Sequence, residues 1–316
     1  MHLLIPFAYG SSRGCEQVLG QLQLPHLQRL LRRLRAGDKD HGDMSSYSPP
    51  HERALARVLG LPVRDGEIPW AAWHARPEPG AWAFVSPCHW VMGSDEVTMS
   101  PAALADFPEH ESRALLASMQ AFFAGDGIEL IYDQPQRWLA RGAALEGMFT
   151  AAADRVAGRA VRDWPARGAG APLLRRLHAE MQMLCYQHPV NDARQARGVE
   201  PVNSFWLSGT GALGAGASVS SPADAITLAN ELRDAALQED WAAWAGAWHA
   251  VDAKHCASLL HAIEACGSNA VELARCKLSL CGQRNALTLD AVPPSWWHGL
   301  KHRMSSQRPS DVLGQL

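Results

Sequence analysis

The residues best suited to chemistry lie between His188 and Gly211, where histidine, asparagine and arginine precede a glycine-rich turn. A guanidinium group grips phosphate or carboxylate, and amides and turn N–H groups complete the hydrogen bonding of such a site. The pattern therefore predicts a site for a small phosphorylated or carboxylate ligand. The alternative is a helix cap at Asn191, with surface arginines and a structural turn. The residues expected to bind are His188, Asn191, Arg194, Arg197 and Asn203.

Two further segments contain histidines that are candidates for binding a metal or a ligand. His249, Asp252 and His255 are spaced three and three, so on a helix they share a face and form a weak candidate site for a transition metal. The alternative is the polar rim of a helix rich in Trp and Ala. His89 follows Cys88 on an expected strand, where it contacts a ligand or caps a tryptophan-rich core.

Composition excludes several classes of function. The chain has 316 residues and a formal net charge of -3, which removes the simplest case for binding nucleic acid or an anionic membrane. No stretch qualifies as a membrane span, and the N-terminal residues look like a strand and not a signal peptide. The seven cysteines are odd in number and contain no C-x-x-C, so we expect reduced thiols and a cytoplasmic protein.

The elements that must position these residues alternate between helix and strand. The apolar segment from His2 to Ala8 predicts a buried first strand, and leucine spacing predicts a helix from Pro25 to Leu34. A polar loop is expected from Ala36 to Pro50. Further helices are expected over 50–60, 101–124, 173–186, 192–197, 222–237 and 256–267, and further strands over 81–87, 89–93, 128–133, 136–142, 204–211, 276–282 and 285–290. Such alternation at both chain ends favours an α/β sheet with covering helices.

Several stretches have counterparts, in the same order, in one known family. They are LPHLQRLL at 24–31, PGAWAFVSPCHWVMGSDEVTM at 79–99, PEHESRALLASMQAFFAGDGIELIYDQPQRWLARG at 108–142, TAAADRVAGRAV at 150–161 and HPVNDARQARGVEPVNSFWLSGTG at 188–211. Together they resemble the archaeal-type, cofactor-independent phosphoglycerate mutases of the alkaline-phosphatase superfamily. The fourth stretch resembles that family's Pro-His-Asp-x-x-Gly-Lys loop, which adds Asp154 to the expected ligand-binding residues.

The departures from this resemblance concern the catalytic apparatus. Active members of the superfamily hold two divalent cations through Asp and His and carry the phosphoryl group on Ser or Thr. Here Tyr9-Gly10 stands where the resemblance implies a metal-binding Asp-Gly, and Ser208 replaces the Arg of Arg-Gly-x-Gly. Ser48, followed by Pro49-Pro50, is a displaced nucleophile or, as is commoner for a serine before two prolines, a loop or cap residue.

The resemblance implies a fold and a function. The fold is a reduced alkaline-phosphatase-like core sheet flanked by helices, formed by residues 1–61 and 205–316, with an inserted α+β lobe over 62–204. A bacterial group labelled regulator of pathogenicity factors is similar in its tryptophan-rich, ligand-poor pattern. We therefore expect a regulatory or anion-binding protein that needs no cofactor. The alternatives are an active mutase or phosphotransferase with manganese or zinc, and a scaffold whose tryptophans bind a protein partner.

Overall fold

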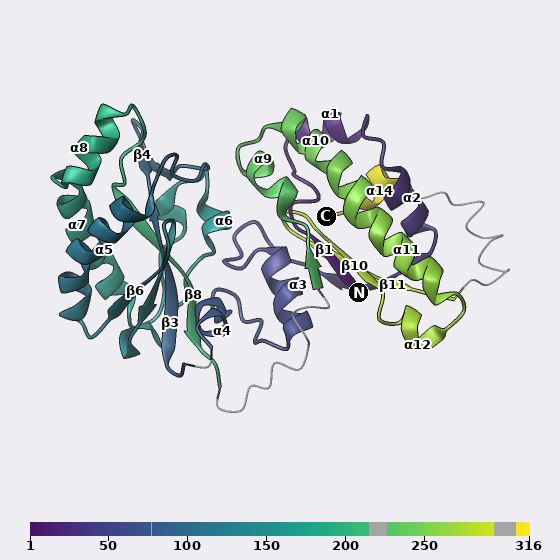
Figure 1. Ribbon diagram of the computed structural model, residues 1–316, viewed down its shortest axis with the longest axis horizontal. Helices are drawn as coiled ribbons and strands as arrows, with labels where there is room; N and C mark the ends of the chain where they lie inside the picture. Colours follow the sequence, from purple (N-terminus) through teal and green to yellow (C-terminus); the bar gives the residue numbers. More distant parts are fainter. Residues whose placement is uncertain (77, 215–225, 294–307) are drawn as a thin grey trace. The chain divides into compact units, whose positions relative to one another are not determined.

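The computed structural model describes residues 1–76, 78–214, 226–293 and 308–316, which form a mixed α/β fold in two units (Figure 1). Unit 1 contains residues 1–45 and 49–60 together with the described residues from 226 onward, and unit 2 contains residues 46–48 and 61–214. Each unit buries its own hydrophobic core. Within the described ranges, no helix has the length and apolar character needed to cross a membrane.

Unit 1 is built on a five-stranded sheet that joins the two ends of the chain. The strand order is β2-β11-β10-β1-β9, with β1 parallel to β9 and β10, and β11 antiparallel to β10 and β2. Parallel strands need a long connection between them, so the apolar segments that form β1 and β10 lie far apart in the sequence. The strands are β1 (His2–Ile5), β2 (Leu34–Asp40), β9 (Ile226–Leu228), β10 (Lys277–Cys281) and β11 (Ala286–Ala291).

The two faces of this sheet differ in how they are covered. Leu3, Ile5 and Leu278 point into a large core with the leucines of α2 and the tryptophans of α10, whereas α3 packs on the opposite face against Leu4 and Cys281. The helical elements of unit 1 are α1 (Arg13–Leu19), α2 (Pro25–Leu31), α3 (Pro50–Leu59), η4 (Asn230–Leu232), α9 (Arg233–Leu237), α10 (Trp241–Val251), the π-helical turn η5 (Asp252–Cys256), α11 (Ala257–Cys266), α12 (Ala270–Leu273) and α14 (Pro309–Leu313).

Unit 2 contains a four-stranded antiparallel sheet of order β6-β7-β3-β8 and a two-stranded ribbon of β4 and β5. Leu115 and Met119 of α5, with Leu177 and Met181 of α7, pack in the core with the sheet side chains. The strands are β3 (Ala81–Cys88), β4 (Trp90–Met92), β5 (Val97–Met99), β6 (Glu129–Gln134), β7 (Arg137–Arg141) and β8 (Ser204–Ala212). The helical elements are α4 (Trp70–His74), α5 (Glu109–Ala124), η1 (Ala143–Leu145), α6 (Ala153–Val156), η2 (Val161–Asp163), α7 (Ala171–Tyr186) and α8 (Pro189–Ala196).

Three expected elements differ from the structure. The expected loop at 36–50 begins with strand residues, because β2 pairs with β11 through residue 40 despite its polar sequence. The expected helix over 101–124 begins only at Glu109, after Pro108. Within the expected helix over 222–237, residues 226–228 form β9 beside β1, and residues 222–225 lie outside the described residues.

The strand after the expected ligand-binding segment also lies elsewhere than expected. We placed residues from 205 onward in the core sheet, but β8 pairs with β3 from Cys88 opposite Ser204 to Ala81 opposite Ala212. The four-stranded sheet of unit 2 therefore includes β8, and the described part of that unit continues to residue 214. An apolar run in the sequence predicts a buried strand, but it does not predict which strand pairs with it.

Candidate functional site

The buried arginine of the predicted anion site is bound by the protein itself. Arg194 on α8 is fully buried, and its guanidinium donates to the carbonyl oxygens of Ala105, Asp106 and Glu200 and to the carboxylate of Glu111. These contacts correct the expectation that Arg194 grips an anion, because they occupy its guanidinium with groups that would otherwise be buried without partners.

Arg197 extends the same network toward the surface. Its guanidinium pairs with Glu111 at 2.7 Å and with Asp106 at 2.9 Å, and its side chain is 36% exposed. These two carboxylates raise the pKa of Arg197, mainly through its hydrogen bond with Glu111. A carboxylate or phosphate ligand would have to compete with them. With Arg197 included, the two arginines of the network are balanced by the carboxylates of Glu111 and Asp106, so the network is nearly neutral.

The amides of the predicted site hold loops in place. The side chain of Asn191 donates to the carbonyl oxygens of Cys185 and Val202 and accepts from the N–H of Val202. Asn203 makes the same kind of two-way contact with the backbone of Trp90. Both amides thus act as substitutes for backbone pairing, a role closer to our alternative of structural caps and turns.

The histidines of the same region have structural partners as well. His188 is the N-cap of α8, where its Nδ1 accepts from the N–H of Val190, and its Nε2 lies 3.0 Å from the hydroxyl of Ser118. His89 donates from Nδ1 to the carbonyl oxygen of Pro201. The helix cap that our alternative places at Asn191 is made by His188.

Ser48 and Asp154 come from different segments of unit 2. Ser48 is 2% exposed, its hydroxyl accepts from the N–H of Gly66, and its own N–H donates to Asp65. These contacts correct the expectation of a displaced nucleophile, since a buried loop-anchoring hydroxyl is not presented to a substrate. Asp154 lies half-buried in the first turn of α6.

The candidate metal ligands of unit 1 are directed to different partners. Asp252 accepts from the N–H groups of His26 and Leu27 and from the ring of His26, so it caps the N-terminus of α2. His255 pairs with Glu231 at 2.6 Å, and His249 is exposed. Over the described ranges, no group of three or more His, Cys, Asp or Glu side chains is placed to share a metal ion. The donor set therefore does not fit the two cations that the sequence resemblance implies.

Aromatic packing occupies the end of the first strand, where that resemblance implies a metal ligand. A side-chain carbon added at Gly10 would lie 2.7 Å from the ring of Trp241, and one added at Gly14 would lie 2.5 Å from it. The indole N–H of Trp244 donates to the carbonyl oxygen of Phe7. The segment after β1 is thus fixed by tryptophans of α10.

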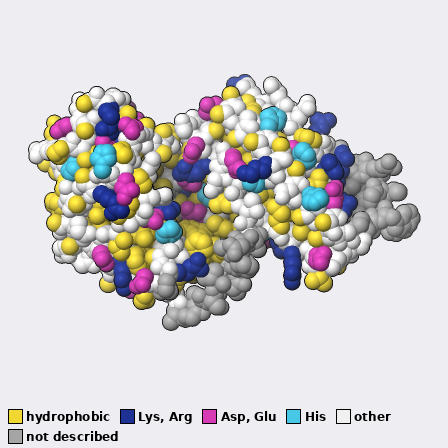
Figure 2. Space-filling model, in the orientation of Figure 1, with side chains coloured by type: hydrophobic (Ala, Val, Ile, Leu, Met, Phe, Trp, Pro, Cys, Tyr) yellow, Lys and Arg dark blue, Asp and Glu magenta, His cyan; other side chains and the backbone are white. Residues whose placement is uncertain are grey.

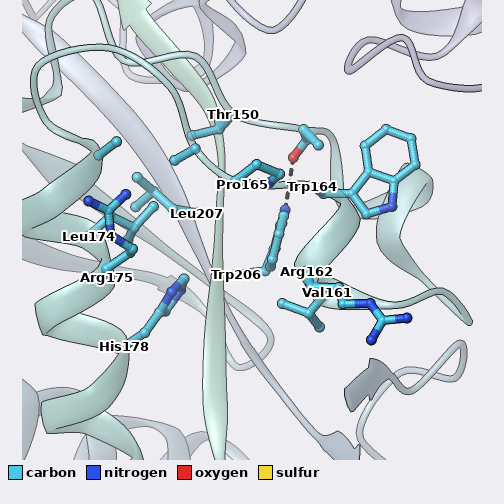
Figure 3. Close-up of a pocket in the computed structure, with 13 residues that line it drawn as sticks. Thr150, Val161, Arg162, Trp164, Pro165, Leu174, Arg175, His178, Trp206 and Leu207 are labelled. Carbon is cyan, nitrogen blue, oxygen red and sulfur yellow. Dashed lines mark hydrogen bonds between the residues drawn. The ribbon is translucent and has the colours of Figure 1, made fainter. Parts of the chain in front are cut away.

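A pocket that our sequence analysis did not predict lies in unit 2 (Figure 3). Its volume is about 170 Å³. Trp206 of β8 and Trp164 lie on one side of it and Leu174 of α7 on the other, and the indole N–H of Trp206 donates to Ala151 (Figure 3). An apolar cavity of about 150 Å³ accepts one benzene ring. The residues that line the pocket are Thr150, Ala151, Val161, Arg162, Trp164, Pro165, Ala166, Ala171, Leu174, Arg175, His178, Trp206 and Leu207.

His178 provides a polar atom in this apolar wall. Its ring extends from α7 toward Trp206 (Figure 3), and its Nε2 is buried with no hydrogen-bond partner among the described residues. Burial lowers the pKa of His178 to about 4, although a hydrogen bond to the backbone of Phe205 acts in the opposite direction. The ring is therefore neutral at pH 7, with its proton on the nitrogen facing Phe205, so Nε2 is an acceptor without a donor.

Arg175 provides the positive charge. It is exposed at the rim of the pocket, and within the described ranges its guanidinium has no hydrogen-bond or ion-pair partner. Arg162, also in the lining, points away from the pocket toward Glu96 and Asp95. On the face drawn in Figure 2, acidic and basic side chains are interspersed.

The sequence carried a signal for this pocket. Ala171, Leu174, Arg175 and His178 are spaced to lie on one face of α7, and this stripe places a histidine and an arginine among apolar residues. The tryptophans gave a second signal, because Trp164 and Trp206 lie in separate segments that only the fold brings together. We expected the tryptophans to fill the cores, and those in the described ranges are buried or half-buried.

Comparison with known proteins gives limited similarity. No protein-family model matches the chain, and no curated protein matches it. Two solved structures are similar over most of their length. The cofactor-independent phosphoglycerate mutase from Thermoplasma acidophilum DSM 1728 is 12% identical, with 92% of this chain and 89% of that chain covered and a TM-score of 0.34. The PH0037 protein from Pyrococcus horikoshii is 11% identical, with 92% and 87% covered and a TM-score of 0.41. Similarity at this level assigns no residue a role.

Proposed function

We propose that this protein binds a small carboxylic acid with one ring in the pocket of unit 2, and that it does so without two-metal phosphoryl transfer. The observation that carries the proposal is the pairing of the acceptor Nε2 of His178 with the unpaired guanidinium of Arg175 at an apolar pocket. An apolar body with a few polar anchors is the usual form of a small-ligand site.

The dimensions and the polar atoms favour an aromatic acid that also carries a hydroxyl group. The volume of about 170 Å³ suits a single ring with small substituents. The ring would lie against Trp164, Trp206 and Leu174, its hydroxyl would donate to His178, and its carboxylate would meet Arg175. This proposal keeps the small carboxylate ligand that we expected from the sequence and moves it from α8 to α7.

The surroundings of the metal candidates support the second part of the proposal. Asp252 binds the N-terminus of α2, His255 pairs with Glu231, and Asp40 pairs with Arg53 and Arg57 at 2.7 Å, so each of these groups already has a partner within unit 1. Recruiting these groups to a cation would break those contacts. A regulatory role is the simplest use of a ligand that is bound and not transformed.

Calorimetric titration of the full chain with 4-hydroxybenzoate and benzoate tests the binding proposal. We expect saturable binding of both acids, weakened about 10-fold by Arg175→Gln, since a hydrogen bond to a charged group contributes about 1.5 to 3 kcal/mol before solvent screening. Arg176→Gln is the matched control, because Arg176 pairs with Asp126 and Glu180.

A second variant separates the role of His178 from general damage. His178→Phe should abolish the preference for 4-hydroxybenzoate over benzoate while benzoate still binds, because only the hydroxyl donor loses its acceptor. Absence of saturable binding, or equal weakening by the Arg175 and Arg176 variants, would refute the proposed site. Phosphoglycerate mutase activity that depends on added manganese would refute the claim about phosphoryl transfer.

A further inference from the structure

Among the described residues, one face of the unit 1 sheet is covered only in part. Helix α3 packs with Ala54 and Leu55 on Leu4, Cys281 and Ala286, which lie toward one end of the strands. Toward the other end, a pocket of about 840 Å³ opens over the same face. Strands buried on both faces normally carry apolar side chains, so polar side chains under this pocket need a reason.

A row of hydrogen-bonding groups crosses three strands beneath this pocket. Nε2 of His2 on β1 lies 2.8 Å from Oγ of Ser279 on β10, which lies 2.8 Å from Oγ1 of Thr288 on β11. His2 and Ser279 are buried, and Thr288 is half-buried and lines the pocket with His2. Burial, and then the charge of Lys277, lowers the pKa of His2 to about 4. The row is therefore uncharged at pH 7 and offers neutral donors and acceptors.

Charged side chains stand at the edge of the same pocket. Arg275 is exposed and has no side-chain partner among the described residues, while Lys277 pairs with Asp290 at 2.9 Å. Across the pocket are Arg57 and the carboxylates of Asp38 and Asp40. The apolar part of the described lining consists of aliphatic side chains such as Ala54, Val58 and Ala274, and no Phe, Tyr or Trp among the described lining residues offers a ring on which a nucleotide base could stack.

We propose that this pocket binds a phosphorylated sugar, with the phosphate held by Arg275 and by Lys277, which exchanges Asp290 for the phosphate, and with the hydroxyl groups held by His2, Thr288 and Asp38. Basic side chains that meet a phosphate make the strong, charge-assisted contacts, and neutral hydroxyls match the uncharged row. The volume accommodates a hexose phosphate and ordered water. The site is separate from the pocket of unit 2 in residues, in ligand and in the variants that test it.

Titration calorimetry of the full chain with glucose 6-phosphate, fructose 6-phosphate, ribose 5-phosphate, glucose and inorganic phosphate tests this proposal. We expect at least one sugar phosphate to bind at least about 10-fold more tightly than glucose or inorganic phosphate, since the site contacts both parts of the ligand. Arg275→Gln and Lys277→Gln should each weaken that binding about 10-fold. Thr288→Val, which conserves volume, should weaken it about 5-fold with inorganic phosphate unaffected.

Two controls keep the result interpretable. Arg29→Gln removes a cation of unit 1 that pairs with Glu264 on α11, and it should leave binding unchanged. Circular dichroism of each variant verifies that the chain is folded. The proposal is overturned if no sugar phosphate gives saturable binding, if inorganic phosphate binds as tightly as the esters, or if the Arg275 and Lys277 variants bind as the wild type does. Arg175→Gln should have no effect on this titration.

Discussion

Arg194 and Arg197 show how burial decides the role of a charged residue. Both contact Glu111, but Arg194 is fully buried and also binds three carbonyl oxygens, whereas Arg197 is 36% exposed. Removing one partner of a buried charge network leaves the other groups without compensation, which typically costs about 3 to 5 kcal/mol. A partly exposed ion pair contributes about 1 kcal/mol or less.

We therefore expect Arg194→Met to lower the free energy of unfolding by about 3 to 5 kcal/mol and Arg197→Met by about 1 kcal/mol. Urea unfolding followed by circular dichroism measures both. Equal and small effects of the two substitutions would mean that Arg194 is not the structural centre of this network. Arg194 would then again be a candidate ligand-binding residue.

The buried imidazoles of His2 and His178 make stability depend on pH. Each has a pKa of about 4 in the folded chain, against 6.5 for an ordinary histidine, mainly because of burial. Between pH 6.5 and 4 the unfolded chain binds more protons than the folded chain. The stabilisation is therefore complete above pH 6.5 and is lost as the pH falls, by about 2 kcal/mol per histidine at pH 5.

A comparison of variants isolates this effect. His178→Phe should reduce the loss of stability between pH 7 and pH 5 by about 2 kcal/mol relative to the wild type. His249→Gln, which removes an exposed histidine, should leave the loss unchanged. Urea titrations at the two pH values give the comparison, and identical pH dependence in the His178 variant and the wild type would contradict the buried neutral imidazole.

At the scale of single residues, the sequence identified chemically capable side chains but not their partners. His188, Asn191, Arg194 and Asn203 all make specific polar contacts, as their types suggested. Their partners come from segments as distant as Trp90 and Ala105, and the sequence does not contain that proximity. His178 was missed because it belongs to a largely apolar helix stripe, where a histidine is usually part of the core.

At the scale of elements, Asp252 links two helices. It sits at the start of the π-helical turn after α10, yet its carboxylate caps α2, more than two hundred residues earlier in the chain. Because Asp252 and α2 are far apart in the sequence, the spacing of His249, Asp252 and His255 contains no sign that Asp252 caps α2. In the structure these three residues lie on helical backbone, in α10 and η5.

We expect Asp252→Ala to lower the free energy of unfolding by about 1 to 2 kcal/mol through loss of the cap on α2. Added manganese or zinc should leave the melting temperature of the wild type unchanged, because a ligand stabilises only the state that binds it. Differential scanning fluorimetry measures both effects. A metal-dependent rise in melting temperature that disappears in the Asp252 variant would show that Asp252 is a metal ligand.

Helices and strands were predicted correctly where the apolar spacing within a segment determines the structure. The predictions were wrong where a segment becomes a strand only by pairing with another strand. The hairpin of β6 and β7 and the helix α7 follow directly from their apolar spacing. The polar strand β2 and the short strand β9 depend on β11 and β1 beside them. Tertiary pairing overrides local propensity at such edges, so sequence alone describes them poorly.

At the scale of the whole molecule, each unit combines a packed core with a pocket lined by its described residues. In unit 1 the tryptophans of α10 pack behind the first strand, and the pocket lies on the opposite, partly covered sheet face. In unit 2 the tryptophans of two segments line the pocket itself. After the first strand, the ring of Trp241 lies so close to Gly10 that a side-chain carbon there would be 2.7 Å from it.

The central claim is that the pocket of unit 2 binds a small hydroxylated aromatic acid through Nε2 of His178. Nuclear magnetic resonance of the chain with ¹⁵N-labelled histidine, during titration with 4-hydroxybenzoate, tests it most directly. We predict that the Nε2 resonance of His178 moves as Nε2 accepts a hydrogen bond from the ligand's hydroxyl group. The other ring nitrogen, which faces Phe205, should keep its proton, and benzoate should change the Nε2 resonance much less. Saturable binding of 4-hydroxybenzoate with no change at His178 would contradict the claim.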